Sequence, residues 1–197
     1  MAEQSIKICI LGESGVGKSS LALRFVSDEF KAYTESTIGA SFMSKQVTLP
    51  STENDERERL VSLKLWDTAG QEKYRSLAPM YYRGSDAAVL VYDITKTFEE
   101  LRGWVYELKN NGPPGLALVV CGNKSDLKED RLVGPLKGED YARTIGALYI
   151  ECSAKTAHNV DKMFSEIASR VPPKMDDCLL EENVDLGKRK NESSGCC

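Results

Sequence analysis

The sequence lacks the features that would embed a protein in a membrane or attach it to nucleic acid. No apolar run approaches the roughly 18 residues that a transmembrane helix needs, so any membrane contact is expected to be an anchor and not a span. The start of the chain has no basic leader or cleavage site of a signal peptide, and Ala2 stands where N-myristoylation needs glycine. The 26 lysines and arginines are scattered, and with 30 acidic residues they leave a net charge of −4. We therefore expect no nucleic-acid partner.

The sequence also has few residues that would bind a transition metal. His158 is the single histidine, and its place at an expected helix start predicts a solvated or capping residue. Cys9, Cys121 and Cys152 fall in apolar, strand-like segments, and none has a zinc-like spacing. We interpret these three as reduced thiols in the core.

What is present is the pattern of one α/β domain. The chain has 197 residues and 41% apolar content, which suits a single globular domain with a short tail. Residues 88–91 and 116–120 are apolar at every position, as strands buried on both faces of a parallel sheet must be. The alternation of such runs with amphipathic stretches predicts a three-layer α/β domain. The runs are 6–11, 19–26, 60–66, 87–93, 116–121 and 148–152.

The last amphipathic stretch predicts a helix that closes the domain. Its apolar face comprises Val160, Met163, Phe164, Ile167, Ala168 and Val171. Asn159 is the expected N-cap, and Pro172-Pro173 ends the helix. We place the domain at 1–172 and expect a disordered tail at 173–197, because the tail is polar and has no period. The charged stretch 50–59 is interpreted as a solvated hairpin tip.

A glycine-rich loop follows the first predicted strand and leads directly into a helix. Residues 12–19 read Gly-Glu-Ser-Gly-Val-Gly-Lys-Ser, the GxxxxGK[ST] pattern of a phosphate-binding loop. Glycine lets successive backbone N–H groups point at one anion, and the helix N-terminus adds its positive end. Lys18 is predicted to reach the β and γ phosphates, and the Ser19 hydroxyl to ligate Mg²⁺. The predicted phosphate-binding set is Ser14, Gly15, Val16, Gly17, Lys18, Ser19 and Ser20.

A second segment, Trp66 to Glu72, directly follows the apolar strand predicted at 60–65. Asp67 at the strand end is predicted to hold the metal, mainly through its water shell. Gly70 is predicted to be a flexible joint whose backbone N–H donates to a γ-phosphate oxygen. The Gln71 amide both donates and accepts, as positioning a water for in-line attack requires. We therefore predict Gln71 and Lys18 as the catalytic pair.

Two further segments select the base. Asn123, Lys124 and Asp126 follow a buried strand, and a fixed carboxylate can accept from guanine N1–H and the 2-amino group together, a donor pair that adenine lacks. The turn Ser153-Ala154-Lys155 offers backbone N–H groups to guanine O6. All four segments end predicted strands, where open α/β sheets place ligands. The sequence therefore predicts a guanine nucleotide site built from four converging loops.

Together these motifs resemble the Ras-like small GTPases, and within them the Rab family, over about residues 5–171. The segments 37–42 and 73–84 are similar to the two Rab switches, and 36–42 and 76–84 are closest to the early-endosomal Rabs. The resemblance implies a mostly parallel six-stranded sheet with about five helices. It also implies that Thr37 ligates Mg²⁺ only with GTP bound and that Phe30 packs on the guanine. Phe42, Trp66 and Tyr81 match the aromatic triad that Rabs present to effectors, whereas Trp104 is interpreted as core.

The resemblance further implies a monomeric GTP/GDP switch that hydrolyses GTP slowly alone and recruits effectors in the GTP form. The loop 12–19 has no arginine, so an activating protein is expected to supply one. A nucleotide exchange factor, a GDP-dissociation inhibitor and a prenylation escort protein are the other implied partners. Cys196 and Cys197 look like a double prenylation site, with Lys188-Arg189-Lys190 adding attraction to anionic lipid. The expected location is the cytoplasm, cycling to the cytosolic face of endosomal membranes.

Two alternatives remain. One is a scaffold that binds GTP without hydrolysing it, and the presence of both Gln71 and Thr37 argues against it. The other is a Ras-type signalling switch at the plasma membrane, against which the terminal cysteine pair and the segment 81–84 argue.

Overall fold

The structure, a computed structural model, describes residues 4–33, 35–49, 58–96 and 98–173. The predicted tail from residue 174, with Cys196 and Cys197, and most of the predicted hairpin tip lie outside the described residues. The strands are β1 Gln4–Leu11, β2 Ala40–Leu49, β3 Arg59–Thr68, β4 Ala87–Asp93, β5 Ala117–Asn123 and β6 Leu148–Glu151. The helices are α1 Lys18–Ser27, the 3₁₀ segment η1 Glu72–Leu77, α2 Ala78–Tyr82, α3 Glu99–Asn111, α4 Pro135–Thr144 and α5 Val160–Arg170.

The six strands form one sheet in the order β2-β3-β1-β4-β5-β6. β2 runs antiparallel to β3, and every other neighbouring pair is parallel. All seven residues of β4 are buried, and the apolar run that precedes Asp93 is typical of a central parallel strand. Within the described residues, the α/β fold, the mostly parallel six-stranded sheet and the five α-helices of the prediction are confirmed.

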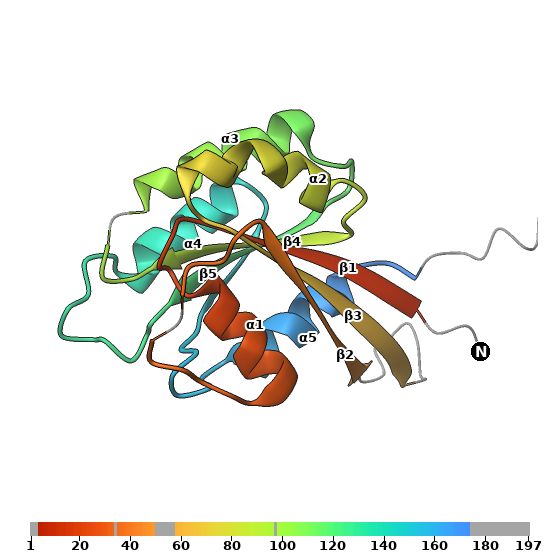
Figure 1. Cartoon of the computed structure of the whole chain (residues 1–197), viewed down its shortest axis with the longest axis horizontal. Helices are drawn as coiled ribbons and strands as arrows, with labels where there is room; N and C mark the ends of the chain where they lie inside the picture. Colours follow the sequence, from red (N-terminus) through yellow and green to blue (C-terminus); the bar gives the residue numbers. More distant parts are fainter. Residues whose placement is uncertain (1–3, 34, 50–57, 97, 174–197) are drawn as a thin grey trace, which may run out of the picture.

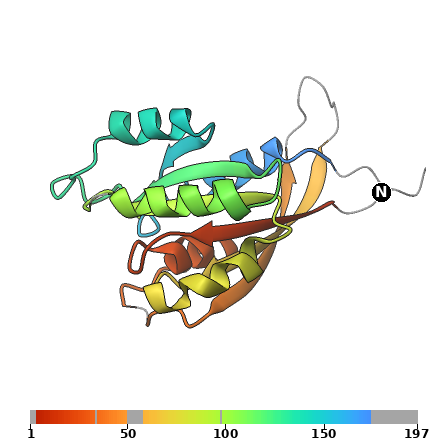
Figure 2. The ribbon, with the colours of Figure 1, turned by 90° about the horizontal axis from the view of Figure 1, so that it is seen from above.

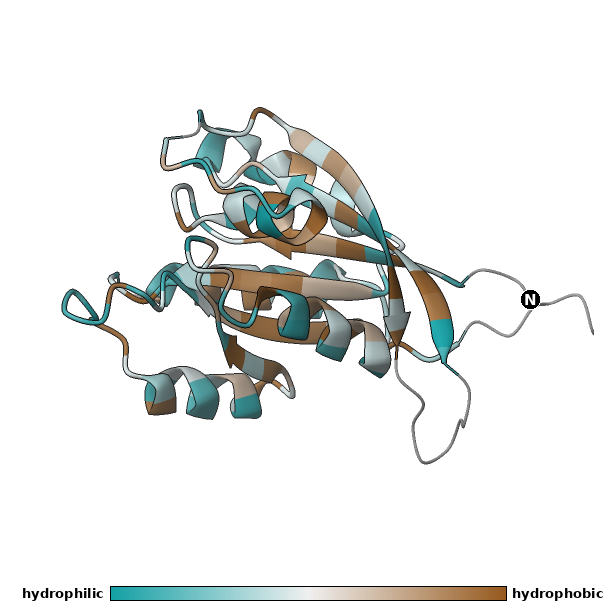
Figure 3. Ribbon diagram, turned by 90° about the horizontal axis from the view of Figure 1, so that it is seen from below, coloured by the Kyte–Doolittle hydropathy of each residue, from teal (hydrophilic) through white to brown (hydrophobic). Residues whose placement is uncertain are grey.

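Helices cover both faces of the sheet (Figure 1). α1 and α5 pack on one face, where the rings of Phe25 and Phe164 stack at 4.1 Å. α2, α3 and α4 pack on the other, and Figure 2 shows α3 between α2 and α4. The central strands are hydrophobic along most of their length, whereas the helices carry hydrophilic outer positions (Figure 3). The sequence pattern of three layers therefore matches the two buried cores.

The predicted closing helix forms as α5, and its six predicted apolar residues are buried. Asn159 occupies the N-cap position, but its side chain makes no capping bond and donates instead to the carbonyl of Glu151 at 2.9 Å. The reason is a left-handed backbone at Asn159, φ 56°, which turns the amide toward β6. His158 is exposed, as predicted.

The three cysteines of the domain are free and buried, as predicted. Burial raises the pKa of the Cys9 thiol to about 12, so this thiol stays neutral in the core. Trp104 is buried on α3, which confirms its interpretation as a core residue. In the part of the chain that the structure describes, no helix has the length and apolar character needed to cross a bilayer.

Candidate functional site

The loops that follow β1, β3, β5 and β6 meet at the carboxyl edge of the parallel strands, around a cavity of about 720 Å³. Every predicted nucleotide-binding residue except Val16 and Ser153 lines it. Those that do are Ser14, Gly15, Gly17, Lys18, Ser19, Ser20, Phe30, Thr37, Gly70, Asn123, Lys124, Asp126, Ala154 and Lys155, together with Gln71. The cavity also has lining residues that the motifs did not indicate, namely Lys31, Ala32, Tyr33, Glu35, Ser36 and Leu127.

The glycine-rich loop is shaped by close contacts that exclude side chains. Gly17 has φ +95°, and a Cβ there would lie 2.3 Å from Nδ2 of Asn123. Behind this loop the Lys18 ammonium donates to the carbonyls of Gly12 and Glu13, both at 2.8 Å. Burial lowers the pKa of Lys18 to about 8, although Asp67 and Glu13 oppose that shift. A buried ammonium in a cavity floored by a helix N-terminus suits an anionic ligand.

Three oxygen-bearing side chains meet beside the first turn of α1. Ser19 Oγ lies 2.7 Å from Oγ1 of Thr37, and it donates to Oδ2 of Asp67. Asp67 is 1% exposed, and its other oxygen, Oδ1, has no hydrogen-bond partner among the described residues. Burial raises the pKa of Asp67, against the lowering effects of Ser19, Lys18 and Thr37. Hydroxyl and carboxylate oxygens are the donors that Mg²⁺ takes, and the unpartnered oxygen fits a cation or one of its waters.

Gly70 and Gln71 line the cavity beside the glycine loop, and Gly70 lies directly against that loop. A Cβ on Gly70 would lie 2.4 Å from Lys18 Nζ and 2.5 Å from the carbonyl of Glu13, so only glycine fits this approach. Gln71 follows in extended backbone at the start of η1, lines the cavity, and accepts the N–H of Tyr74 at 3.0 Å. Gln71 therefore borders the same cavity as Lys18, and its role toward an attacking water stays a prediction.

Asn123 and Lys124 contact the glycine loop as well as the cavity. Asn123 Nδ2 donates to the carbonyl of Val16 at 2.8 Å, and Lys124 Nζ donates to that of Gly15 at 2.9 Å. Val16 itself is 5% exposed and lies behind the cavity wall. These bonds join the end of β5 to the loop that follows β1, so two of the four predicted segments are directly connected.

Ser153 and Asp126 form a pair that the sequence analysis did not foresee. Ser153 is fully buried, and its hydroxyl donates to Oδ1 of Asp126 at 2.6 Å. Two backbone donors predicted to reach a base are already engaged, because Ser153 N–H donates to His158 O and Ala154 N–H donates to Asn123 Oδ1 at 3.3 Å. The structure therefore places Ser153 beneath the carboxylate of Asp126 and away from the cavity surface.

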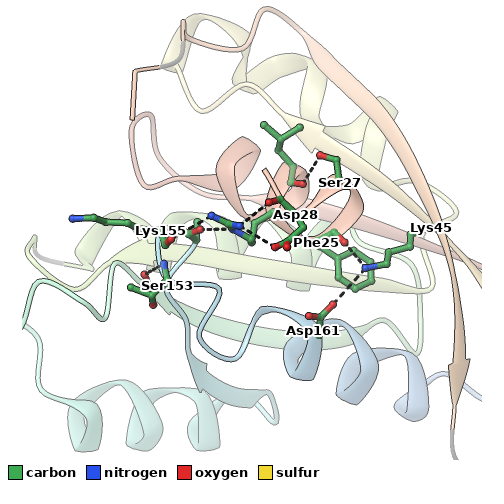
Figure 4. A network of polar contacts seen from close by, with 11 residues as sticks. Phe25, Ser27, Asp28, Lys45, Ser153, Lys155 and Asp161 are labelled. Atoms are coloured by element: carbon green, nitrogen blue, oxygen red, sulfur yellow. Dashed lines mark hydrogen bonds and ion pairs between the residues drawn. The ribbon is translucent and has the colours of Figure 1, made fainter. Parts of the chain in front are cut away.

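Arg24, near the end of α1, supports the same loop and was also missed. Its Nε donates to Ala154 O at 2.9 Å, and its other nitrogens contact Lys155 O and Asp28. Figure 4 shows Asp28 and Lys155 in one network of polar contacts, and Lys45 reaching Asp161 in the same view. A contact across 130 residues of sequence leaves no local pattern, so nothing in the chain indicated it.

Phe42, Trp66 and Tyr81 form a ring cluster outside the cavity. Phe42 is 53% exposed and meets Trp66 edge-on at 5.5 Å, while Tyr81 stacks on Trp66 at 5.9 Å. Lys7 Nζ lies 5.2 Å from the centre of the Trp66 ring. The cluster joins β2, β3 and α2, and its Trp66 and Tyr81 rings are partly buried, with Tyr81 packed against the second core.

Comparison with known proteins agrees with this arrangement. The Ras family model matches residues 7–173. Ras-related protein Rab-22A of Homo sapiens is 49% identical over 174 residues, covering 87% of this chain and 86% of that protein. Ras-related protein Rab-31 of Rattus norvegicus is 50% identical over 176 residues, covering 88% and 86%. GTP-binding protein ypt5 of Schizosaccharomyces pombe is 49% identical over 169 residues, covering 84% and 77%.

Proposed function

This chain belongs to the Ras family, as one of its Rab GTPases, and we propose that the cavity at the edge of its sheet is the site of its guanine nucleotide chemistry. The protein binds GTP and GDP, hydrolyses GTP, and acts as a GTP-dependent switch in vesicle trafficking. The observation that carries the assignment is the convergence of Lys18, Ser19 and Asp126 in one cavity, with the buried Asp67 carboxylate accepting from Ser19 at its edge.

The phosphates bind along the glycine loop. Gly15 and Gly17 keep the backbone open to the cavity, and Lys18 exchanges its contacts with loop carbonyls for phosphate oxygens. At the other end Asp126 accepts the two donors of the guanine edge, and Ser153 acts through Asp126 by holding its carboxylate. Phe30, which is 36% exposed on the cavity wall, covers the base.

Mg²⁺ fits the cluster of Ser19, Thr37 and Asp67. The two hydroxyls would bind it directly, and the unpartnered oxygen of Asp67 would accept from one of its waters. The ion supplies charge neutralisation for the phosphates when it is bound. Because Thr37 lies in the segment that leads into β2, its engagement couples the state of the site to the outer surface.

Hydrolysis depends on Gln71 orienting the attacking water and on Lys18 stabilising charge on the transferred phosphoryl group. The loop 12–19 supplies no arginine, so an activating protein contributes one in trans. Loss of the γ-phosphate releases the N–H of Gly70 and the hydroxyl of Thr37, which loosens the segments around them. Exchange of GDP then requires a separate exchange factor.

The exposed cluster of Phe42, Trp66 and Tyr81 binds effectors in the GTP form. Support comes from its position, because β2 begins three residues after Thr37 and α2 follows η1, which begins directly after Gln71. We further propose anchoring through prenylated Cys196 and Cys197, handled by an escort protein and a GDP-dissociation inhibitor. The similarity to Rab-22A and Rab-31 supports endosomal membranes as the location.

Single-turnover phosphate release from GTP-loaded protein tests the proposal, with Gln71→Leu as the comparison. The account predicts slow release by the natural chain and release at least about tenfold slower from the variant, since only positioning of the water is lost. Equal release from both would remove Gln71 from the mechanism. Intact GTP on both proteins would favour the scaffold alternative, and failure to load GTP would contradict the site itself.

A further inference from the structure

We propose that Arg131 and Glu151, neither of which lines the cavity, form a brace that positions Asp126 and so sets the preference of this protein for guanine. The inference rests on the proposed role of Asp126 in base recognition. Arg131 lies five residues after Asp126, in the segment between β5 and α4, and Glu151 is the last residue of β6. Both are positioning residues, since they act through Asp126.

The ion pair of the brace is bidentate. Arg131 donates from one terminal nitrogen to Oε1 of Glu151 at 2.6 Å and from the other to Oε2 at 2.8 Å. The two side chains are only 21% and 18% exposed. The first nitrogen also donates to the carbonyl of Val133 at 3.0 Å, which fixes the guanidinium to its own segment. Planar, two-bond pairs of this kind define orientation as well as attraction.

The carboxylate of Glu151 is held from a second side. The hydroxyl of Tyr149 donates to Oε1 at 2.9 Å, and it lies 2.9 Å from the hydroxyl of Tyr92 on β4. Partial burial alone would raise the pKa of Glu151, but the bonds from Arg131 and Tyr149 lower it below its usual range. Glu151 therefore stays charged near neutral pH, and its position is fixed relative to two strands of the sheet.

From this fixed point, contacts lead to Asp126 from both directions. On the β6 side, Ser125 N–H donates to Cys152 O at 3.0 Å, and Ser153 donates to Asp126 itself. On the other side, the N–H groups of Leu132 and Val133 both donate to Ile94 O, at 2.9 and 3.0 Å. Hydrogen bonds therefore fix the segment that carries Asp126 on both sides of Arg131. The ion pair with Glu151 connects this segment to β6.

The chain offers a matched control. Arg143 on α4 also pairs with two acidic residues, Glu139 and Asp140, but its side chain is 71% exposed and does not line the cavity. Exposed pairs of this kind contribute little to structure. If partial loss of arginine pairing were itself enough to disturb the site, Arg143→Met would have the same effect as a change at Arg131.

The test compares binding of GDP with binding of IDP, whose hypoxanthine lacks the 2-amino group. In the natural chain GDP is expected to bind about 10 to 100 times more tightly, the value of one hydrogen bond to a charged acceptor. The variant Arg131→Met with Glu151→Gln removes the ion pair without leaving a buried charge. The ratio of its affinities for GDP and IDP is expected to fall at least about threefold, because a displaced Asp126 carboxylate accepts a weaker hydrogen bond from the 2-amino group.

The outcomes distinguish failure of the Arg131–Glu151 brace from failure of base recognition by Asp126. Arg131→Lys keeps the positive charge but not the planar two-bond geometry, so its GDP to IDP ratio is expected to lie between those of the natural chain and the double variant. Arg143→Met is expected to leave the ratio unchanged. Equal weakening of GDP and IDP by the double variant, with the ratio unchanged, would overturn the brace, as would an unchanged affinity for both. If the natural chain itself fails to prefer GDP over IDP, or if Asp126→Ala keeps that preference, the proposed base recognition fails instead. Thermal melting verifies that each variant is folded.

Discussion

The ammonium of Lys124 lies 2.6 Å from Oδ2 of Asp93, joining the end of β5 to the end of β4 directly behind the glycine loop. Asp93 is buried with its side chain 1% exposed, and Lys124 also donates to Gly15 O. Breaking such a pair leaves a buried carboxylate without its cation.

Lys124→Met is therefore expected to lower the free energy of unfolding by about 2 to 4 kcal/mol, toward the low end of the cost of breaking a buried pair because Lys124 is 33% exposed. It is also expected to speed GDP release. Urea unfolding measures the first effect and displacement of a fluorescent GDP analogue the second. Lys109→Met, at an exposed position on α3, is the control and should change neither. Equal stability of Lys124→Met and the control would contradict the structural role of the pair.

The same pair gives a pH dependence. Burial would raise the pKa of Asp93, but the bonds from Lys124 and Thr95 outweigh it, so the pKa in the folded protein lies below its usual value. The folded state then binds a proton less readily than the unfolded chain, whose Asp titrates near about 3.9. The stabilisation by the charged form is complete above about pH 5 and is lost as the pH falls through the folded pKa.

Unfolding of the natural chain and of Asp93→Asn, measured in urea between neutral pH and pH 3, isolates this contribution. The stability difference between the two is expected to shrink as the pH falls below about 4. A difference that stays constant over this range would show that Asp93 does not titrate as the structure indicates.

Gly17 is the glycine whose replacement is expected to harm the site most specifically. A Cβ there would overlap the Asn123 amide at 2.3 Å, breaking the bond from Asn123 to Val16. Gly17→Ala is expected to lose tight GDP binding. Gly115→Ala is the matched control, because Gly115 also has positive φ, +73°, but nothing lies within 4 Å of its added Cβ. Gly115→Ala is expected to lower the free energy of unfolding by about 1 to 2 kcal/mol. It is expected to retain bound GDP, as measured by nucleotide content after purification.

Asp126→Asn tests the chemistry of base choice. The new carboxamide presents a donor where the carboxylate accepts, so a hydrogen-bond donor faces the 2-amino group of guanine, which is itself a donor. Affinity for GDP is expected to fall about 100-fold or more, and affinity for XDP, whose base carries a carbonyl at that position, to rise. Competition between the two nucleotides measures both. Unchanged preference for GDP would show that the base is read elsewhere.

Much of the fold follows from local sequence. The unbroken apolar run of β4 and the 3.6-residue period of α5 predict both elements because each depends on burial of its own residues. β2 is less evident, since several of its residues are exposed and its strand form depends on pairing with β3. The short α2 is likewise stabilised by packing against neighbouring elements, with Tyr82 in the core and its hydroxyl on Glu107.

The candidate site likewise contains residues that the sequence predicts and residues that only the fold brings together. Gly17, Lys18 and Asp126 belong to motifs whose spacing encodes their task, so the sequence predicts that they meet. Arg24 and Arg131 support the neighbouring loops through bonds to residues 20 or more positions away, and a bond of that kind leaves no period or spacing to recognise. Ser153 lies between these cases, because its motif was recognised but its place beneath Asp126 depends on the packed fold.

If the γ-phosphate orders the surface beside the cavity, hydrogen–deuterium exchange of that surface depends on the bound nucleotide. Protein loaded with GDP is compared with protein loaded with a non-hydrolysable GTP analogue. The account predicts slower exchange with the analogue in residues 35–41 and 70–77, through Thr37 and Gly70, with β4 and β5 unchanged as internal references. Identical exchange in those two segments, with both nucleotides fully bound, would contradict the switch.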